Sequence, residues 1–151
     1  EFDCYKFRSM KPNDNAHVFQ ASKGDARITK VGSFMRKTSI DELPQFFNVL
    51  FGDMSVVGPR PHMVSHTNLY AESVDKFMVR HFVKPGITGL AQISGFRGEV
   101  EADNDIINRV KYDIFYIENW SLLLDIKITV QTALNALINP THNYLGCFNE
   151  I

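Results

Sequence analysis

Two neighbouring carboxylates and a rigidly held arginine are the residues of this chain whose types and spacing could do chemistry. Asp41 and Glu42 lie where the sequence predicts the start of a helix, and Gly58-Pro59-Arg60-Pro61 follows shortly after. The positive end of a helix keeps a carboxylate ionised, so that it can act as a nucleophile or bind a metal ion. A guanidinium held nearby can bind phosphate. Metal-assisted phosphate chemistry requires this combination.

A structural role explains the same residues. Asp41 as a helix N-cap, with Glu42 complementing the helix dipole, is a common arrangement, and position alone does not separate this role from catalysis. Arg60 can likewise be a surface residue of a proline-rich turn. However, the flanking prolines restrict the backbone, which lowers the entropy cost of binding a phosphate or carboxylate.

The helix that would carry the carboxylates has two possible starts. With Ser39 as N-cap, Pro44 would fall at the fifth helical position, where its missing N–H removes a hydrogen bond. With Asp41 as N-cap, Pro44 falls in the first turn, so we prefer this start. The helix then ends at Gly52. Its spacing predicts a buried stripe of Leu43, Phe46, Phe47 and Leu50.

The neighbouring elements follow from periodicity and turn residues. A helix from Thr29 would place Val31, Phe34 and Met35 on one face and end with Arg36 and Lys37, where cations suit the dipole. Residues 11–24 are polar and indicate a loop. We further predict strands over 2–10 and 87–93, and helices over 62–80, 105–117 and 121–138.

Composition limits the class of protein. At 151 residues and 44% hydrophobic content, the chain predicts a single domain, residues 1–151. A net charge of −1 gives no overall attraction to nucleic acid. Cys4 and Cys147 lack metal-ligand spacing, which favours reduced thiols, and Trp120 and the phenylalanines are expected in the core. No apolar run approaches the roughly 20 residues of a membrane span. Because the chain begins with Glu1, we interpret it as a fragment.

Three weaker motifs suggest other chemistry. Asp103-Asn104-Asp105 is a D-x-D sequence of the kind found in nucleotide-sugar glycosyltransferases, but the alternating strands and helices of their fold are not predicted here. His62 and His66 have no third ligand for zinc. The glycines of residues 85–98 could bind a phosphate through backbone N–H groups or simply form turns, and they match no known phosphate-binding pattern.

Four stretches together resemble the bacterial sugar transferases known as monotopic phosphoglycosyl transferases, or polyprenyl-phosphate sugar-1-phosphate transferases. They are KFRSM (6–10), DARITKVGSFMRKTSIDELPQFFNVLFGDMSVVGPRP (25–61), VKPGITGLAQISGFRG (83–98) and YDIFYIENWSLLLDIKI (112–128), and they occur in family order. The HFVKPG variant at 81–86 followed by Gly98-Glu99 is most similar to the long branch that transfers hexose 1-phosphate and starts exopolysaccharide or capsule synthesis.

The resemblance implies an enzyme in which Asp41 attacks the β-phosphate of a UDP-sugar. UMP leaves, and polyprenyl (undecaprenyl) phosphate then accepts the phosphosugar from Asp41. Glu42 would help Asp41 to hold Mg²⁺. The residues implied to bind the nucleotide phosphates are Arg60 with Pro59 and Pro61, and Lys6, Arg8, Arg27 and Arg36.

The resemblance also implies a compact α+β domain, mainly helical with short strands. The full-length protein would lie on the cytoplasmic face of the bacterial inner membrane, anchored by a hydrophobic segment upstream of this fragment. Two alternatives stay open: a D-x-D glycosyltransferase, and a non-catalytic nucleotide-sugar-binding or adaptor domain.

Overall fold

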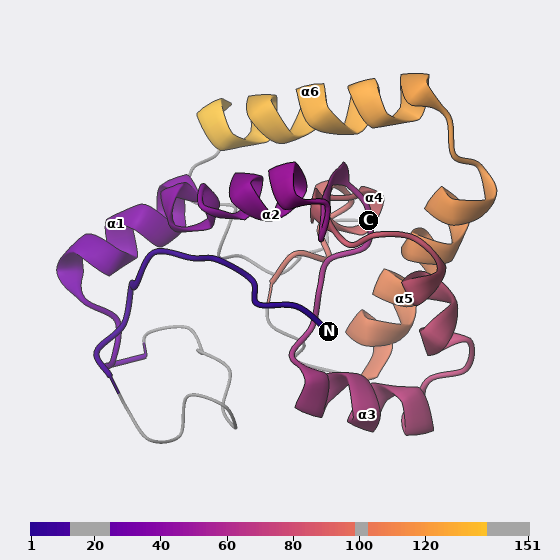
Figure 1. Ribbon diagram of the computed structural model, residues 1–151, viewed down its shortest axis with the longest axis horizontal. Coiled ribbons are helices and arrows are strands. Elements are labelled where there is room, and N and C mark those ends of the chain that lie inside the picture. The colour runs from indigo at the N-terminus through magenta and orange to yellow at the C-terminus, as the bar shows by residue number, and fades with distance from the viewer. Residues whose placement is uncertain (13–24, 99–102, 139–151) are drawn as a thin grey trace, which may run out of the picture.

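The computed structural model describes residues 1–12, 25–98 and 103–138. This part of the chain is mainly helical around a small parallel sheet, which confirms the α+β class (Figure 1). Below, α denotes an α-helix, η a 3-10 helix and β a strand. In chain order the elements are α1 (Lys30–Thr38), η1 (Ile40–Glu42), α2 (Gln45–Phe51), β1 (Ser55–Val57), α3 (Val64–Ser73), η2 (Phe77–Phe82), β2 (Gly86–Thr88), α4 (Leu90–Ile93), α5 (Asp103–Glu118) and α6 (Leu122–Ile138).

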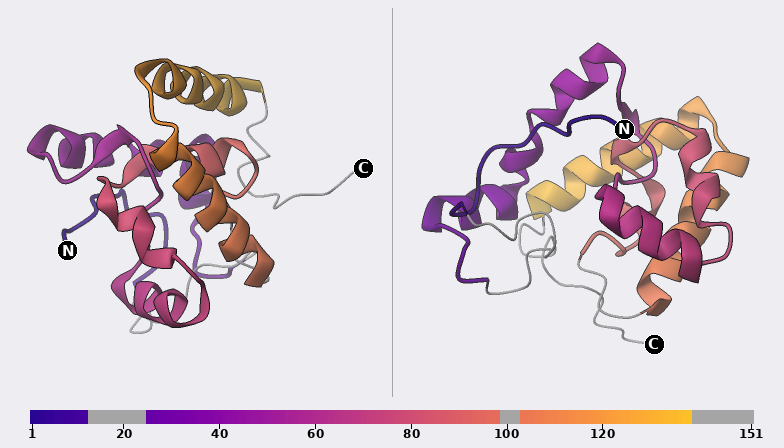
Figure 2. Two further views of the ribbon diagram at one scale, coloured as in Figure 1. Left: turned by 90° about the vertical axis from the view of Figure 1, so that its right-hand side faces the viewer. Right: turned by 60° about the horizontal axis from the view of Figure 1, so that its bottom comes forward.

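Helix α5 is the centre of the packing. It runs between α3 and α6, as two further views show (Figure 2). Its first half contributes Ile106 and Val110 to a core cluster with Phe77 of η2. Its second half contributes Tyr116 to a second cluster with Val57, Ile128 and their neighbours. The predicted helices over 105–117 and 121–138 are therefore confirmed within two residues at each end. No helix among the described residues is long and apolar enough to cross a membrane.

The sheet consists of β1 and β2, paired in parallel with Ser55 opposite Gly86. The two backbones are very close just beyond the pair, because a Cβ added to Gly86 would lie 2.1 Å from the nitrogen of Gly58. Only Gly86–Thr88 is a strand, so the predicted strand over 87–93 is wrong in its second half. There the chain turns into α4, whose Leu90 and Ile93 pack against the second core cluster.

The predicted strand over residues 2–10 does not form. The described segment makes only an isolated bridge, between Met10 and Ile28. Elsewhere a side chain takes the place of a neighbouring strand: Asn48 accepts a hydrogen bond from the Tyr5 N–H at 3.0 Å and donates to the Asp3 carbonyl at 2.8 Å. This segment is therefore fixed by α2. Residues 13–24, most of the predicted loop, lie outside the described part.

Helix α1 confirms the start predicted at Thr29. The Thr29 hydroxyl accepts a hydrogen bond from the Gly32 N–H at 2.9 Å, which is standard N-capping. Arg36 and Lys37 occupy the last turn, as expected. The helix ends at Ser39, which adopts a left-handed conformation (φ 58°) and turns the chain towards the two carboxylates.

The start predicted for the next helix is wrong. Asp41 is not an N-cap but the middle residue of η1, and α2 begins only after Pro44. Glu42 and Leu43 each donate a backbone hydrogen bond three residues back, as in a 3-10 turn. Proline has no N–H to continue that ladder, so the chain restarts as an α-helix with Pro44 as its N-cap. Gly52 ends α2 in the left-handed conformation, as predicted.

The apolar stripe predicted on this helix is exposed to solvent, so the prediction that it is buried is wrong. The side chains of Leu43, Phe46, Phe47 and Leu50 are between 51% and 77% exposed, and Val31 and Phe34 of α1 and Trp120 are exposed as well. The buried face of α2 instead carries Gln45 and Asn48. Periodicity shows which residues share a face of a helix, but it does not show which face the protein covers.

The single helix predicted over 62–80 is two elements. Helix α3 ends at Ser73 and η2 begins at Phe77, with Lys76 in a left-handed conformation between them. The break lets Val74 and Phe77 both enter the first core cluster against α5. Tertiary packing therefore overrides a continuous helical pattern here.

Candidate active site

The two predicted carboxylates are buried in the turn η1. Both Asp41 and Glu42 are less than a tenth exposed. The turn is held from the N-terminal segment, where the Phe7 N–H donates to the Asp41 carbonyl at 2.9 Å. The left-handed Ser39 sets its entry. A buried pair of adjacent carboxylates is costly unless cations compensate it, so the surroundings of the pair decide its chemistry.

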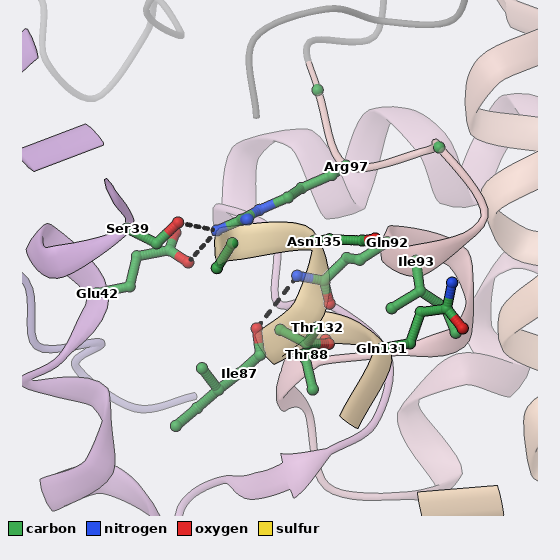
Figure 3. A pocket seen from close by; sticks show the side chains of 13 residues that line it. Ser39, Glu42, Ile87, Thr88, Gln92, Ile93, Arg97, Gln131, Thr132 and Asn135 are labelled. Carbon is green, nitrogen blue, oxygen red and sulfur yellow. Dashed lines mark hydrogen bonds and ion pairs between the residues drawn. The ribbon is translucent and has the colours of Figure 1, made fainter. Parts of the chain in front are cut away.

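Three cations surround Glu42. Arg60 forms a fork on its carboxylate, with nitrogen–oxygen distances of 2.5 and 3.3 Å. Lys6 donates to the same carboxylate at 3.1 Å. Arg97 approaches the other oxygen at 3.3 Å and also donates to the Ser39 hydroxyl at 2.9 Å (Figure 3). Glu42 thus gathers two guanidinium groups and one ammonium group from three separate parts of the chain.

The two carboxylates differ in proton affinity. Burial raises the pKa of Asp41, and the negative charge of Glu42 raises it further. Burial also acts to raise the pKa of Glu42, but the charges of Arg60, Lys6 and Arg97 outweigh it and hold that pKa far below its ordinary value. The surroundings therefore favour the charged form of Glu42, whereas Asp41 binds a proton more readily.

The Pro-Arg-Pro turn presents Arg60 as the sequence predicts. The carbonyl of Pro59 accepts from the Gly86 N–H at 2.9 Å, and the carbonyl of Arg60 accepts from the Arg80 guanidinium at 2.8 Å. Pro59 is buried and Pro61 half-buried. The backbone on both sides of the Arg60 side chain is therefore fixed before any ligand arrives.

The remaining predicted phosphate-binding residues are spread out. Arg36 lies close enough to Asp41 for its charge to lower the pKa of that carboxyl. Arg27 forms an ion pair with Asp25 at 2.6 Å, at the turn before α1 rather than on Glu42. Arg8 is exposed on the N-terminal segment. The structure thus brings Lys6 and Arg60 together on Glu42 and places Arg27 apart from them.

A cavity of about 330 Å³ opens beside Glu42 and Arg97. Its charged end is formed by these two residues and Ser39. Its other side combines the apolar side chains of Ile87 and Ile93 with the polar ones of Gln92 of α4 and Gln131, Thr132 and Asn135 of α6 (Figure 3). A ligand with a phosphate at one end and hydroxyl or amide groups at the other would match this lining.

A family model described as "Bacterial sugar transferase" matches residues 1–139. The chain belongs to the bacterial sugar transferase family. The cavity, the carboxylate pair and the three cations on Glu42 all lie within the matched residues.

Several relatives of this sugar transferase domain carry specific names. It is 57% identical over 138 residues to the UDP-glucose:undecaprenyl-phosphate glucose-1-phosphate transferase of Klebsiella pneumoniae, covering 91% of this chain and 30% of the relative. It is 52% identical over 143 residues to the protein of the same name from Xanthomonas campestris pv. campestris, covering 93% and 30%. It is 46% identical over 148 residues to the undecaprenyl-phosphate galactose phosphotransferase of Salmonella typhimurium, covering 87% and 29%. The chain spans just under a third of the length of these relatives.

Sequence reasoning missed one cation of the sugar transferase site. Arg97 lies 55 residues after Glu42, in the glycine-rich stretch that was considered only for its backbone N–H groups. A signal was present, because Arg97 is the only Lys or Arg between residues 85 and 98, and it stands next to Gly98. Position in sequence gives no indication that this loop reaches η1.

The carboxylates offer unequal sites for a divalent metal ion. Both oxygens of Glu42 already face cationic groups, whereas the charge of Asp41 is disfavoured by burial and would be stabilised by a metal. Among the described residues, no group of three or more His, Cys, Asp or Glu side chains could hold a metal ion. Mg²⁺ still fits Asp41, because this ion usually binds through one or two carboxylates together with substrate phosphates.

Proposed function

We propose that the protein containing this chain transfers a hexose 1-phosphate from a UDP-sugar to undecaprenyl phosphate and releases UMP. The observation that carries the proposal is the buried Asp41–Glu42 pair with Arg60, Arg97 and Lys6 gathered on Glu42 beside a cavity. The names of the relatives support the same reaction. We infer that it is the first membrane step of exopolysaccharide or capsule assembly.

Asp41 is the nucleophile of the proposed reaction. One of its carboxylate oxygens attacks the β-phosphorus, and the bond from that phosphorus to the bridging oxygen breaks. UMP departs with the bridging oxygen, and the sugar phosphate stays bonded to Asp41. A phosphate oxygen of undecaprenyl phosphate then attacks the same phosphorus, which frees the Asp41 carboxylate and gives the lipid-linked diphosphate sugar. Covalent catalysis divides one difficult transfer into two easier steps.

Glu42 prepares the cations for the diphosphate. Because its pKa is held far below the ordinary value, it keeps its charge and holds Arg60, Arg97 and Lys6 in place before the substrate binds. An arriving diphosphate can accept hydrogen bonds from these two guanidinium groups. Donors that are already oriented stabilise developing charge without reorganisation in the transition state.

We propose that Mg²⁺ binds at Asp41 together with the substrate diphosphate, with Glu42 as a second ligand. When bound, Mg²⁺ neutralises phosphate charge as the leaving group departs. Coordination by Glu42 requires that a contact on its carboxylate gives way, and the two longest contacts there, from Arg60 Nη1 and from Arg97, are both 3.3 Å.

We propose that the exposed apolar side chains of α1 and α2 rest on the cytoplasmic face of the membrane. Val31 and Phe34 of α1 and Phe46, Phe47, Leu50 and Phe51 of α2 are all more than half exposed. Exposed apolar side chains in this number on two successive helices are typical of an interaction site. A lipid surface suits it because the proposed acceptor is itself a lipid phosphate.

A UMP-release assay tests the proposal. The full-length protein in vesicles with undecaprenyl phosphate is incubated with UDP-glucose, UDP-galactose and other UDP-sugars. We expect UMP release, with UDP-glucose as the best donor, and its loss in Asp41→Asn. UMP release from none of the sugars would instead support a non-catalytic binding domain. Loss of turnover in Asp103→Asn or Asp105→Asn, with Asp41→Asn still active, would support a D-x-D glycosyltransferase.

A further inference from the structure

A second group of charged side chains is buried behind the proposed active site. Arg80 of η2 and Asp113 of α5 form an ion pair at 2.7 Å, and both side chains are 2% exposed. Arg109, one turn before Asp113 on α5, is also buried. His62 lies between the two arginines, with Nδ1 against Arg80 and Nε2 at 3.1 Å from Arg109. Of these four residues, the sequence pattern pointed only to His62, which lacked the partners of a zinc ligand.

Each buried arginine donates a hydrogen bond to the backbone at or beside one active-site arginine. The Arg80 guanidinium donates to the carbonyl of Arg60 at 2.8 Å. The Arg109 guanidinium donates to the carbonyl of Gly98, the residue after Arg97, at 2.9 Å. Arg60 and Arg97 are the two guanidinium groups that converge on Glu42. A buried arginine is therefore hydrogen-bonded to the backbone at or next to each of these two residues.

The buried group also connects the backbone at Arg60 to the backbone next to Arg97, because His62 contacts both Arg80 and Arg109. Burial, with the charges of Arg80 and Arg109, lowers the pKa of His62 to about 2, so the ring is neutral: one of its nitrogens can accept a hydrogen bond from an arginine, and the other carries the N–H. Asp113 supplies a counter-charge that acts on both arginines. A buried ion pair adds little stability compared with apolar side chains of the same size. The arrangement is therefore better explained by the geometry it imposes than by stability alone.

We propose that Arg80 and Arg109, held by Asp113 and His62, are positioning residues that set Arg60 and Arg97 for the diphosphate. The inference rests on the proposed function, because it assigns these arginines to the same site. Arg80 and Arg109 touch no substrate. They act by fixing the backbone carbonyl of Arg60 and that of Gly98, the residue after Arg97.

A double-substitution cycle in the full-length, membrane-inserted protein tests the inference. Arg80→Lys keeps the charge opposite Asp113 but removes the planar fork that reaches Arg60. We expect it to lower kcat/KM for the UDP-sugar about tenfold, the loss associated with one well-placed hydrogen bond to a charged group. If Arg80 acts through Arg60, the double variant Arg60→Lys/Arg80→Lys should be no more than about twofold worse than the poorer single variant. Independent effects would multiply to about a hundredfold and would overturn the inference.

A matched control separates positioning from loss of stability. Ile106→Val loosens the same α5–η2 packing without touching a polar group, because Ile106 is in the core cluster with Phe77. We expect it to lower Tm while leaving kcat/KM within about twofold, and to combine multiplicatively with Arg60→Lys. Arg80→Lys with kcat/KM within twofold of the wild type would contradict the proposal.

A second cycle covers the case in which Arg80→Lys fails to fold. Arg109→Lys and Arg97→Lys are combined in the same way, and their effects should again fail to multiply. Both cycles are also measured through the dissociation constant for UDP, which needs no turnover. UMP release that is absent in the wild type would reject the proposed function, whereas a wild-type enzyme with multiplicative cycles would reject only the positioning role.

Discussion

Asp41 and Glu42 are consecutive residues of one buried turn, yet their pKa values move in opposite directions. Burial raises the pKa of Asp41, and the charge of Glu42 adds to this. Three cations more than cancel the effect of burial on Glu42. One turn thus places Asp41, whose pKa is raised, beside Glu42, whose pKa is lowered. This difference is the physical basis for assigning the nucleophile to Asp41 and the organising role to Glu42.

Replacing Asp41 by Asn should abolish transfer without unfolding the protein. Asparagine keeps the shape of the side chain and removes a charge that burial disfavours, so Tm should stay the same or rise slightly. UMP release by the full-length variant should fall to background, because an amide oxygen does not form the phosphosugar bond. A variant that turned over near the wild-type rate would remove Asp41 as the nucleophile.

Activity should depend on a divalent metal ion, with Mg²⁺ preferred. Excess EDTA should stop UMP release, and added Mg²⁺ should restore it, because hard oxygen ligands beside a diphosphate suit this ion. Isothermal titration gives a readout without turnover: UDP should bind more weakly to the EDTA-treated protein. The magnesium site would be rejected by undiminished UMP release in EDTA.

Arg60→Lys should lower kcat/KM for the UDP-sugar about tenfold or more. Lysine keeps the charge but not the fork that spans both oxygens of Glu42, and hydrogen bonds to charged groups contribute about 1.5–3 kcal/mol. Lys111→Gln is a suitable control, because it removes an exposed cation from α5. Equal kcat/KM values for Arg60→Lys and wild type would mean that Arg60 is structural and that the Pro-Arg-Pro turn only sets the path of the backbone.

Asp113 should make stability fall as pH rises from about 4 to about 6. Burial raises its pKa from 3.8 to about 6, despite the opposing charges of Arg80 and Arg109. Between these values the folded state binds more protons than the unfolded state, so unfolding becomes easier with rising pH. The free energy of unfolding of the wild type, measured relative to Asp113→Asn, should decline across this window by at most about 1.4 kcal/mol per pH unit. A flat or rising difference would show that Asp113 does not titrate in this way.

Charge placed on the exposed apolar face should impair lipid-linked product formation. Phe47→Glu should leave Tm nearly unchanged because the side chain is exposed, but it should reduce product formation in vesicles about tenfold, since a carboxylate is poorly tolerated at an apolar interface. Met78→Glu, at an exposed position of η2, is the matched control and should remain active. Equal activity of the two variants would argue against contact between α2 and the membrane.

Local sequence predicted some of these features and missed others for definable reasons. The helix start at Thr29, the helix end at Gly52 and helices α5 and α6 depend on residues within one or two turns, and those predictions hold. The start of α2 was wrong because a 3-10 turn and a helix share the same first-turn chemistry. The strand over residues 2–10 was wrong because the hydrogen-bonding partner is the Asn48 side chain rather than another strand.

The sequence by itself determined the family, the carboxylate pair and the Pro-Arg-Pro turn, because each is a contiguous pattern of residue types. Only the tertiary structure decided that Arg97 joins Arg60 on Glu42. It also decided that Arg80 and Arg109 donate hydrogen bonds to the carbonyls of Arg60 and Gly98. Those contacts connect residues between 11 and 55 positions apart, and no local periodicity encodes them. The structure also decided which face of α2 is covered. A helical repeat places apolar residues on one side, and only packing shows whether that side meets the protein or its surroundings.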